Sequence, residues 1–275
     1  MKAVFLLARA EFQESLRNRW ALSAIILLAS LAFALALLGS APMGETKVSP
    51  LNITTVSLSS LSIYLIPLIA LMLSFDTIVG ERERGTLLLL LTYPVARWQV
   101  VVGKFAGHIA ILAVTILLGY GSTGVYLLIN TTSGAGDWLL YAGMMYSSLF
   151  LGAVFIALGY LLSVLVNDRA TASGAAIAVW LFMVVIFDLL LLGLLLADNA
   201  HNLAPNVLET LILLNPTDVY RLFNLTGSEA ADLLAETTSI AQSTKASPTA
   251  LLVILFLWIA VPLASAILLF QRREL

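Results

Sequence analysis

The sequence predicts an all-α integral membrane protein with six transmembrane helices, an amphipathic helix at the N-terminus, short cytoplasmic helices after the second span and a helical outer segment before the sixth. Three observations favour this fold class. Of the 275 residues, 60% are hydrophobic and 11% are charged, against roughly 45–50% apolar and about 25% charged residues in soluble domains. Six segments are apolar over the roughly 20 residues that a spanning helix needs. Lysine and arginine gather in the segments on one side of these spans.

The six predicted spans cover residues 20–38, 58–79, 103–129, 139–166, 171–197 and 249–270. Lipid offers no hydrogen-bond partner to backbone groups, so each span has to be a helix. The third, fourth and fifth are long enough to tilt or to project beyond the lipid. The chain shows no internal repeat, which favours one membrane domain over residues 1–275.

The distribution of positive charge predicts the orientation, because cytoplasmic segments of membrane proteins carry more lysine and arginine. With a cytoplasmic N-terminus, only Lys47, Arg221 and Lys245 lie outside. Eleven lie inside: Lys2, Arg9, Arg17, Arg19, Arg82, Arg84, Arg97, Lys104, Arg169, Arg272 and Arg273. The bias predicts that both termini are cytoplasmic.

Composition excludes several function classes. The net charge of -2 argues against a nucleic-acid partner, which requires a basic surface. The absence of cysteine excludes disulfides and thiol catalysis. The chain has no phosphate-binding loop with which to hydrolyse ATP. It also lacks the His-Glu-x-x-His and Gly-x-Ser-x-Gly motifs of an intramembrane enzyme, so we expect a non-catalytic subunit.

The segment of residues 1–19 reads as an amphipathic helix on the inner membrane surface. Its apolar side chains recur at helical spacing, and polar side chains fill the other face. The apolar positions are Val4, Phe5, Ala8, Phe12 and Leu16. Membrane lipids are therefore expected contacts of this helix.

The inner segment of residues 80–102 predicts two short helices separated by a kink. Its run of leucines at residues 87–91 is too short to cross a bilayer. Pro94 disfavours helix at the residue before it and suits the first turn of a new helix. The predicted element presents Glu81, Arg82, Glu83 and Arg84 to the cytosol.

The outer segment of residues 198–248 is too long for a simple connector in a compact membrane domain. It contains two weakly amphipathic stretches, at residues 205–214 and 218–225, separated by Asn215 and Pro216. We interpret it as a partly helical cap or docking surface on the periplasmic side.

Two aspartates in the spans are candidate pathway residues, because ionisable groups in lipid are costly. Asp188 lies deep in the fifth span, where it could line a path or make a polar contact with a neighbouring helix. Asp76 lies near the inner end of the second span, where an ordinary helix-end role is the alternative.

Histidine and methionine supply the other candidate metal ligands. His108 and His201 fall on opposite membrane faces, so they cannot form one site, and each reads as a local hydrogen-bonding residue. Met144 and Met145, with Met43 and Met72, could offer thioether sulfur to Cu(I). Apolar filling is the ordinary role of methionine, so the sequence assigns no firm metal site.

Two stretches of small residues permit close approach between helices. Gly103 and Gly107 are four residues apart on one predicted helix, and residues 170–178 consist of alanine, serine, glycine and threonine apart from Ile177. Such spacing lets two backbones meet closely. Packing within one subunit or between two is the expected role.

The inner segment resembles the cytoplasmic loop of ABC-2 type permeases, the membrane subunits of one class of ATP-binding cassette transporter. The matching positions are Glu81, Arg82, Glu83, Arg84, Gly85, Thr86, residues 87–91, Pro94, Arg97, Gly103 and Lys104. The outer stretch that starts at Asn215 also resembles the family's outer segment. In topology the resemblance covers the whole chain.

The resemblance implies that the chain couples a separate ATPase subunit to the membrane. Mg-ATP would be bound by that partner, with no cofactor held by this chain, and a second copy of the chain would complete the assembly. The implied coupling residues are Glu81, Arg82, Glu83, Arg84, Gly85, Thr86, Pro94 and Arg97, with the N-terminal helix as a second contact. A bacterial inner membrane is the implied location.

Within this family the chain is most similar to permeases that serve the maturation of the copper centres of nitrous oxide reductase. That narrower resemblance implies a periplasmic copper-handling partner, with copper, a sulfur species or only a mechanical signal crossing the membrane. The alternatives are an exporter of a lipid, haem-like or drug substrate, a non-transporting membrane anchor, and an intramembrane enzyme.

Overall fold

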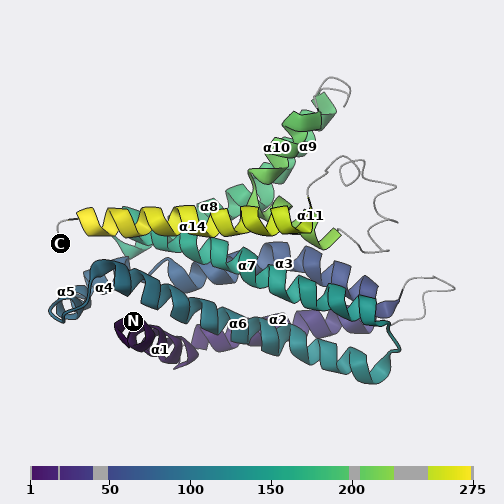
Figure 1. The fold of residues 1–275 in the computed structure, drawn as a ribbon, viewed down its shortest axis with the longest axis horizontal. Helices are drawn as coiled ribbons and strands as arrows, with labels where there is room; N and C mark the ends of the chain where they lie inside the picture. The colour runs from purple at the N-terminus through teal and green to yellow at the C-terminus, as the bar shows by residue number, and fades with distance from the viewer. Residues whose placement is uncertain (1, 18, 40–48, 198–204, 226–246, 274–275) are drawn as a thin grey trace.

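The computed structural model describes residues 2–17, 19–39, 49–197, 205–225 and 247–273, and within these residues the only regular secondary structure is helical (Figure 1). The helices follow in the order α1 (Lys2–Arg17), α2 (Arg19–Gly39), α3 (Pro50–Ser74), α4 (Val79–Glu83), α5 (Thr86–Leu91), α6 (Arg97–Asn130), α7 (Ala135–Leu165), α8 (Arg169–Leu181), the π-helical turn η1 (Phe182–Ile186), α9 (Phe187–Ala197), α10 (Pro205–Leu213), α11 (Pro216–Leu225) and α14 (Pro248–Arg272).

The membrane helices match the predicted spans. Among the described residues, five helices are long and apolar enough to cross a membrane, and α1 with α2 gives a sixth when this bent pair is counted as one span. The two helices of that pair meet at 68°. The 34 residues of α6 extend over about 51 Å at roughly 1.5 Å per residue. Its ends therefore project beyond a hydrocarbon core of about 30 Å, as the length of the predicted third span indicated.

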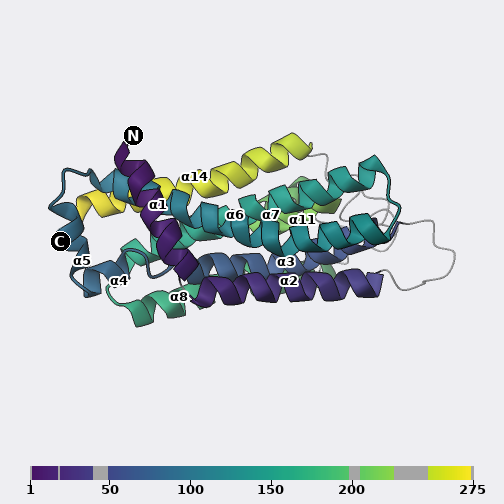
Figure 2. The same ribbon diagram turned by 90° about the horizontal axis from the view of Figure 1, so that it is seen from below.

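The two ends of the bundle are formed by different elements. One end carries α1, α4, α5 and the end of α14, so both termini lie there; we call it the basal end (Figures 1 and 2). The other, distal end carries the turn between α6 and α7. Both termini lie on one side of the bundle, as expected for six spans.

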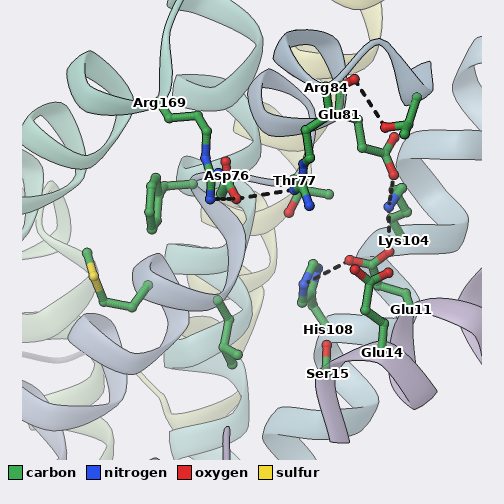
Figure 3. A pocket seen from close by; sticks show the side chains of 14 residues that line it. Glu11, Glu14, Ser15, Asp76, Thr77, Glu81, Arg84, Lys104, His108 and Arg169 are labelled. Carbon is green, nitrogen blue, oxygen red and sulfur yellow. Dashed lines mark hydrogen bonds and ion pairs between the residues drawn. The ribbon is translucent and has the colours of Figure 1, made fainter. Parts of the chain in front are cut away.

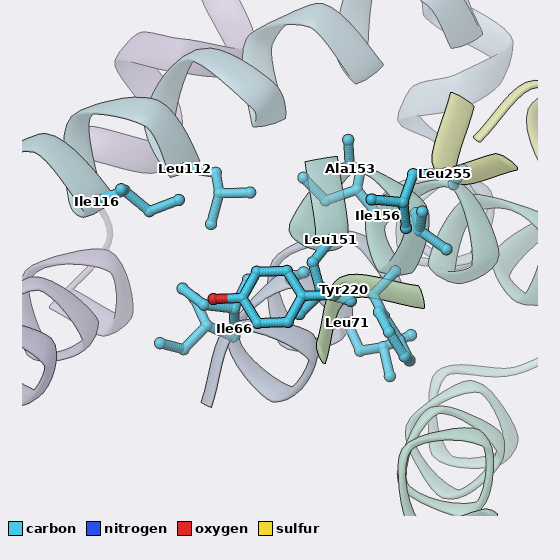
Figure 4. Packing of buried hydrophobic residues seen from close by; sticks show 14 of the residues in the cluster. Ile66, Leu71, Leu112, Ile116, Leu151, Ala153, Ile156, Tyr220 and Leu255 are labelled. Carbon is cyan, nitrogen blue, oxygen red and sulfur yellow. The ribbon is translucent and has the colours of Figure 1, made fainter. Parts of the chain in front are cut away.

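The core forms around α7, which packs most extensively against α3 and α14, while α6 packs against α1 and α2. Tyr220 of α11 reaches into this core and lies beside Ile66 and Leu151 (Figure 4). The Tyr220 ring is fully buried, and its hydroxyl lies 2.9 Å from Ser148 Oγ. In lipid, close packing and such hydrogen bonds hold helices together, so α11 is part of the bundle.

Arginines close the helix ends at the basal side. Arg97 Nη1 donates to the carbonyls of Phe270 at 3.0 Å and Arg273 at 2.6 Å, at the end of α14. Arg273 in turn donates to the carbonyls of Leu165 and Val166, both at 3.1 Å, where α7 ends. The last carbonyls of a helix have no partner within the helix and carry partial negative charge, so these guanidinium groups stabilise both ends.

The inner segment is broken around Pro94, as predicted, but the helix that follows, α6, begins later than Pro94. A further break between α4 and α5 was not predicted. Gly85 adopts a left-handed φ of 72° between α4 and α5, a conformation that glycine takes without strain. Pro94 is exposed in an irregular stretch, and α6 starts at Arg97. The Gln99 side chain accepts a 3.0 Å hydrogen bond from the Ala96 backbone and so fixes this start.

The outer segment contains the two predicted helical stretches, now seen as α10 and α11. The fifth span changes to π-helix at η1 and continues as α9, and in Figure 1 α9 and α10 rise away from the long axis of the bundle. A π-helical turn is a recognised cause of such bends. Residues 198–204 and 226–246 of this segment lie outside the described residues.

Candidate functional site

A polar cavity of about 640 Å³ opens at the basal end between α1, α3, α4, α6 and the start of α8 (Figure 3). Its charged lining residues are Glu11, Glu14, Asp76, Glu81, Arg84, Lys104 and Arg169. Carboxylates and cations alternate around it, and the sequence segment singled out after the second span supplies its α4 wall. The cavity therefore joins the predicted coupling segment to the membrane helices.

Lys104 of α6 binds two carboxylates from different elements. Its Nζ lies 2.5 Å from Glu11 Oε2 of α1 and 2.8 Å from Glu81 Oε1 of α4. The Lys104 side chain is only 7% exposed, and those of Glu11 and Glu81 are 11% and 21% exposed. Buried charges persist only when they are paired. This cluster, which we call the Lys104 clamp, ties α1, α4 and α6 together.

His108, one helical turn after Lys104, extends the clamp to α7. Its Nε2 lies 3.2 Å from Glu11 Oε1, and its Nδ1 lies 2.8 Å from the Tyr160 hydroxyl. The carboxylate of Glu11 can only accept, so Nε2 donates to it, and the ring bridges Glu11 and the Tyr160 hydroxyl. The sequence predicted a local hydrogen-bonding histidine, and its geometry fits that role. His201 lies outside the described residues.

The four charged residues of the predicted coupling segment each contact a different span. Glu81 binds Lys104 of α6, and Arg82 Nη2 donates to the Val166 carbonyl at the end of α7 at 2.9 Å. Glu83 Oε1 accepts from the Arg169 backbone at the start of α8 at 2.8 Å. Arg84 Nη2 lies 3.6 Å from Asp76 Oδ2 at the end of the second span. Glu81 and Arg82 are half-buried, whereas Glu83 and Arg84 are exposed.

The remaining predicted coupling residues divide between surface and structure. Gly85, Thr86 and Pro94 are exposed, and so are Leu88 and Leu89 of α5. Arg97 is engaged at the end of α14, with its guanidinium 5.8 Å from the centre of the Phe270 ring. Cation–π contact and helix capping both bind it to the fold, so its geometry joins α6 to α14.

Asp76 lies at the basal end of the second span, in the turn between α3 and α4. Its Oδ2 lies 2.6 Å from Arg169 Nη2. A contact so close to the cavity rim fits a helix-end role that links α3 to α8.

Gly103 and Gly107 let α1 lie directly on α6. A methyl group on Gly103 would come within 2.7 Å of Leu7 Cβ, and one on Gly107 within 2.8 Å of the Ala8 carbonyl oxygen. This crossing brings Glu11 to Lys104 and His108. The spacing predicted close approach, and its partner is the N-terminal helix of the same chain.

Asp188 forms a second ionic site, toward the distal end. Arg221 of α11 donates through Nη2 to Asp188 Oδ2 at 2.6 Å and through Nη1 to Asp218 Oδ1 at 2.7 Å. Burial raises the pKa of Asp218 to about 7, with Arg221 opposing the rise and Asp188 adding to it. The sequence offered Asp188 a path or a polar contact, and the structure provides an ion pair with an arginine 33 residues away.

The methionines do not converge. Met144 is fully buried in the apolar core, where its Sδ lies 3.7 Å from Ser148 Oγ. Met145 packs against that core, Met72 lines the basal cavity, and Met43 lies outside the described residues. No group of three histidine, aspartate or glutamate residues suited to a metal occurs in the part of the chain that the structure describes.

Sequence reasoning missed Glu11 and the clamping role of Lys104. The signal was present as two pairs on α6 at a spacing of four, Gly103 with Gly107 and Lys104 with His108. Residues at that spacing lie on one helix face, so the same face combines close approach with two polar groups.

Comparisons with known proteins agree with this architecture. The model of the ABC-2 family transporter protein matches residues 5–275. The probable ABC transporter permease protein NosY of Pseudomonas aeruginosa is 44% identical, over 100% of both chains. The probable ABC transporter permease protein NosY of Stutzerimonas stutzeri is 42% identical, over 99% of both chains.

Proposed function

We propose, from the premise that this chain belongs to the ABC-2 family of transporter permeases, that α4 and α5 pass the motion of a separate ATPase subunit to the membrane helices. Membership of the family implies an ATPase partner and a dimeric assembly. Mg-ATP would be bound by the partner. This chain would contribute the membrane path and the segment α4–α5 that transmits the motion, which we call the lever.

One observation carries the proposal: Glu81, Arg82, Glu83 and Arg84 bond to α6, the end of α7, the start of α8 and the end of the second span in turn. A force on this short segment would therefore reach four spans through direct side-chain contacts, with no residue in between. Packed elements move as units because interiors are dense. The Lys104 clamp adds α1 to the moving body.

The exposed side of the segment is suited to seat in the ATPase. Leu88 and Leu89 are 59% and 66% exposed on α5, next to the exposed Glu83 and Arg84. Apolar anchors with a charged rim are typical of protein interfaces. Docking is thus assigned to α5 with the charged rim beside it, and transmission depends on the half-buried Glu81 and Arg82 of α4.

This division gives a direct test with two variants. Leu88→Asp with Leu89→Asp should abolish recovery of the cognate ATPase in a pull-down from detergent extracts, because charge replaces the apolar anchors. Glu81→Gln with Arg82→Gln should retain the ATPase and lose the response of the spans to Mg-ATP. The response is measured as the change in distance between spin labels at Thr132→Cys in two copies of the chain.

Leu128→Asp with Ile129→Asp, two exposed apolar residues at the distal end of α6, provides the matched control for added charge. It should leave ATPase recovery unchanged. Full recovery with the α5 variant, or a normal Mg-ATP response with the Glu81 and Arg82 variant, would remove the lever from this segment.

For the biological process, we propose support of copper-site assembly in nitrous oxide reductase, on the basis of the full-length similarity to NosY. The expected partners are a NosF-like ATPase and a NosD-like periplasmic copper-handling protein, with copper as a candidate cargo. The test is co-purification with the periplasmic partner, which would support this process. An exporter of a lipid, haem-like or drug substrate would assemble without it.

The proposed assembly contains two copies of this chain in the inner membrane with cytoplasmic termini. In the fifth span only 11% of the most apolar stretch is buried within the chain, against 67% in α7. Its outward side chains include Ile177, Leu181 and Leu189. A second copy of the chain or lipid has to cover this face. In a dimer formed through it, the distal ionic site of each copy would lie near the partner subunit.

A further inference from the structure

The outer helix α11 is attached to the fifth span at its π-helical turn. Asn215 Nδ2 and Thr217 Oγ1 both donate to the Met183 carbonyl, at 2.8 and 3.2 Å. A π-helical turn displaces the regular backbone hydrogen bonds and is frequent at functional sites. Asn215 and Thr217 therefore have a structural role that the coupling function does not use: they dock α11 onto η1.

One helical turn further along, the charges of this contact do not balance. Arg221 supplies one positive charge, and Asp188 and Asp218 supply two carboxylates. The guanidinium takes one oxygen from each. The remaining oxygens, Asp188 Oδ1 and Asp218 Oδ2, are buried, and no donor reaches either among the described residues. The Asp218 side chain is only 4% exposed and that of Asp188 is 27% exposed, so Asp218 is the carboxylate that is better shielded from solvent.

A single proton removes both deficits. An ionised carboxylate only accepts hydrogen bonds, whereas a protonated one also donates. Both carboxyl groups bind the same Arg221 guanidinium, and Asp188 is among the groups that raise the pKa of Asp218. A proton on one of them would give its neighbour a donor and would leave one carboxylate to balance Arg221.

We propose that Asp188 and Asp218 bind one proton between them, and that this proton keeps α11 docked on the fifth span. The proton is thus a ligand of the distal site, and its release leaves two facing carboxylates with one arginine. Like charges at such a site repel and disfavour the docked arrangement.

The pH dependence follows from linkage. The docked pKa of Asp218, about 7, lies above its ordinary value of 3.8, so the docked state binds more protons between these two values. Docking is strongest at acidic pH, weakens as the pH rises from about 4 to about 7, and stays weakest above that.

Other titratable groups on the elements packed against α11 are more remote in effect. Tyr64 of α3 acts on Arg221 and not directly on Asp218. The remaining described ones are Asp137, Tyr141, Tyr146 and Tyr160 on α7, Glu209 on α10 and Arg272 at the basal end of α14. None of these is among the groups that shift the pKa of Asp218.

The absence of native cysteine permits a clean accessibility experiment. Val219→Cys places a thiol at a fully buried position of α11, and Thr132→Cys places one at an exposed position of the α6–α7 turn. The purified full-length chain in detergent is labelled with a maleimide from pH 5 to pH 8.5, and the ratio of the two labelling rates cancels the titration of the thiol itself. The ratio should rise roughly threefold or more up to about pH 7 and then level off.

Neutral replacements identify the proton. Asp218→Asn and, separately, Asp188→Asn supply a permanent amide donor, so each should keep the ratio low and flat across the pH range. Asp137→Asn, a distal carboxylate that accepts from Ser49 Oγ at 2.7 Å, should retain the unmodified pH profile. A ratio independent of pH in the parent, an unaltered profile in both amide variants, or loss of the monodisperse protein in both would overturn the proposal.

Discussion

At the scale of the residue, Lys104 shows how a charge is retained beside the lipid. Its ammonium group satisfies two carboxylates, from α1 and α4, and all three side chains are largely buried. Removing one member of a buried ionic cluster costs more than the cluster contributes, because the partners keep their charge without compensation. The stability of the basal end therefore depends on the complete set.

We predict that Lys104→Met destabilises the chain by about 3 kcal/mol, the lower end for a broken buried pair because Glu81 keeps some solvent contact. Thermal unfolding in detergent, followed by the loss of the monodisperse fraction, measures this change. Lys104→Arg should lose much less, since it keeps the charge. Adding Glu81→Gln to Lys104→Met should restore part of the loss, and its failure to do so would argue against a charge-based clamp.

The candidate residues were predictable only where the residues that form the pattern are close together in the sequence. Glu81, Arg82, Glu83 and Arg84 are consecutive, so their pattern was visible in the sequence. Asp188 was identified as costly, but its partner Arg221 lies across a long outer segment, and the sequence suggested no pairing between them. Glu11 was hidden for another reason: it lies on the buried face of an amphipathic helix whose apolar residues drew attention to a different face.

At the scale of the element, the crossing of α1 over α6 fixes the position along α6 at which Glu11 meets Lys104. Phe5 and Leu6 remain exposed on α1, so the helix has its small and polar side toward α6 and part of its apolar side outward. An amphipathic helix at an interface places that outward side against lipid headgroups and acyl chains. The contact at Gly107 is what permits this arrangement, since any side chain there would meet the backbone of α1.

Gly107→Ala should loosen α1. The added methyl group would lie 2.7 Å from Glu11 Cβ and 2.8 Å from the Ala8 carbonyl oxygen, and overpacking of this kind costs about 1–3 kcal/mol. Amide hydrogen exchange in α1 should become faster. Gly121→Ala on the same helix meets nothing within 4 Å and should leave exchange unchanged, while improving helix propensity by up to about 1 kcal/mol. Equal exchange in both variants would contradict the close crossing.

Element types followed from hydropathy, and their ends depended on local contacts. The predicted stretches at residues 205–214 and 218–225 correspond to α10 and α11, because amphipathic spacing and the intervening proline identify them. The start of α6 was placed three residues too early, because the side chain of Gln99, not Pro94, caps it. The π-helical turn η1 has no sequence signature, and the partners of its Met183 carbonyl, Asn215 and Thr217, come from a distant part of the sequence.

At the scale of the whole molecule, the two ends of the bundle have separate chemistry. The basal end combines the charged cavity, the exposed α5 and the arginine-capped helix ends, whereas the distal end carries α11 and its carboxylate pair. The apolar core of the bundle separates them. The lever and the proton site can thus communicate only through the spans, and the fifth span touches both, since Arg169 borders the cavity and Asp188 belongs to the distal site.

The orientation predicted from the positive charges can be tested on the intact cell. Thr86 is exposed at the start of α5 at the basal end, and Thr132 is exposed in the distal turn. Because the chain contains no other cysteine, each variant reports one compartment. A membrane-impermeant maleimide should label Thr132→Cys on whole cells opened only at the outer membrane, and Thr86→Cys only after lysis. Labelling of Thr86→Cys before lysis would place α4 and α5 in the periplasm, away from any ATP-hydrolysing subunit, and the lever would have no source of motion.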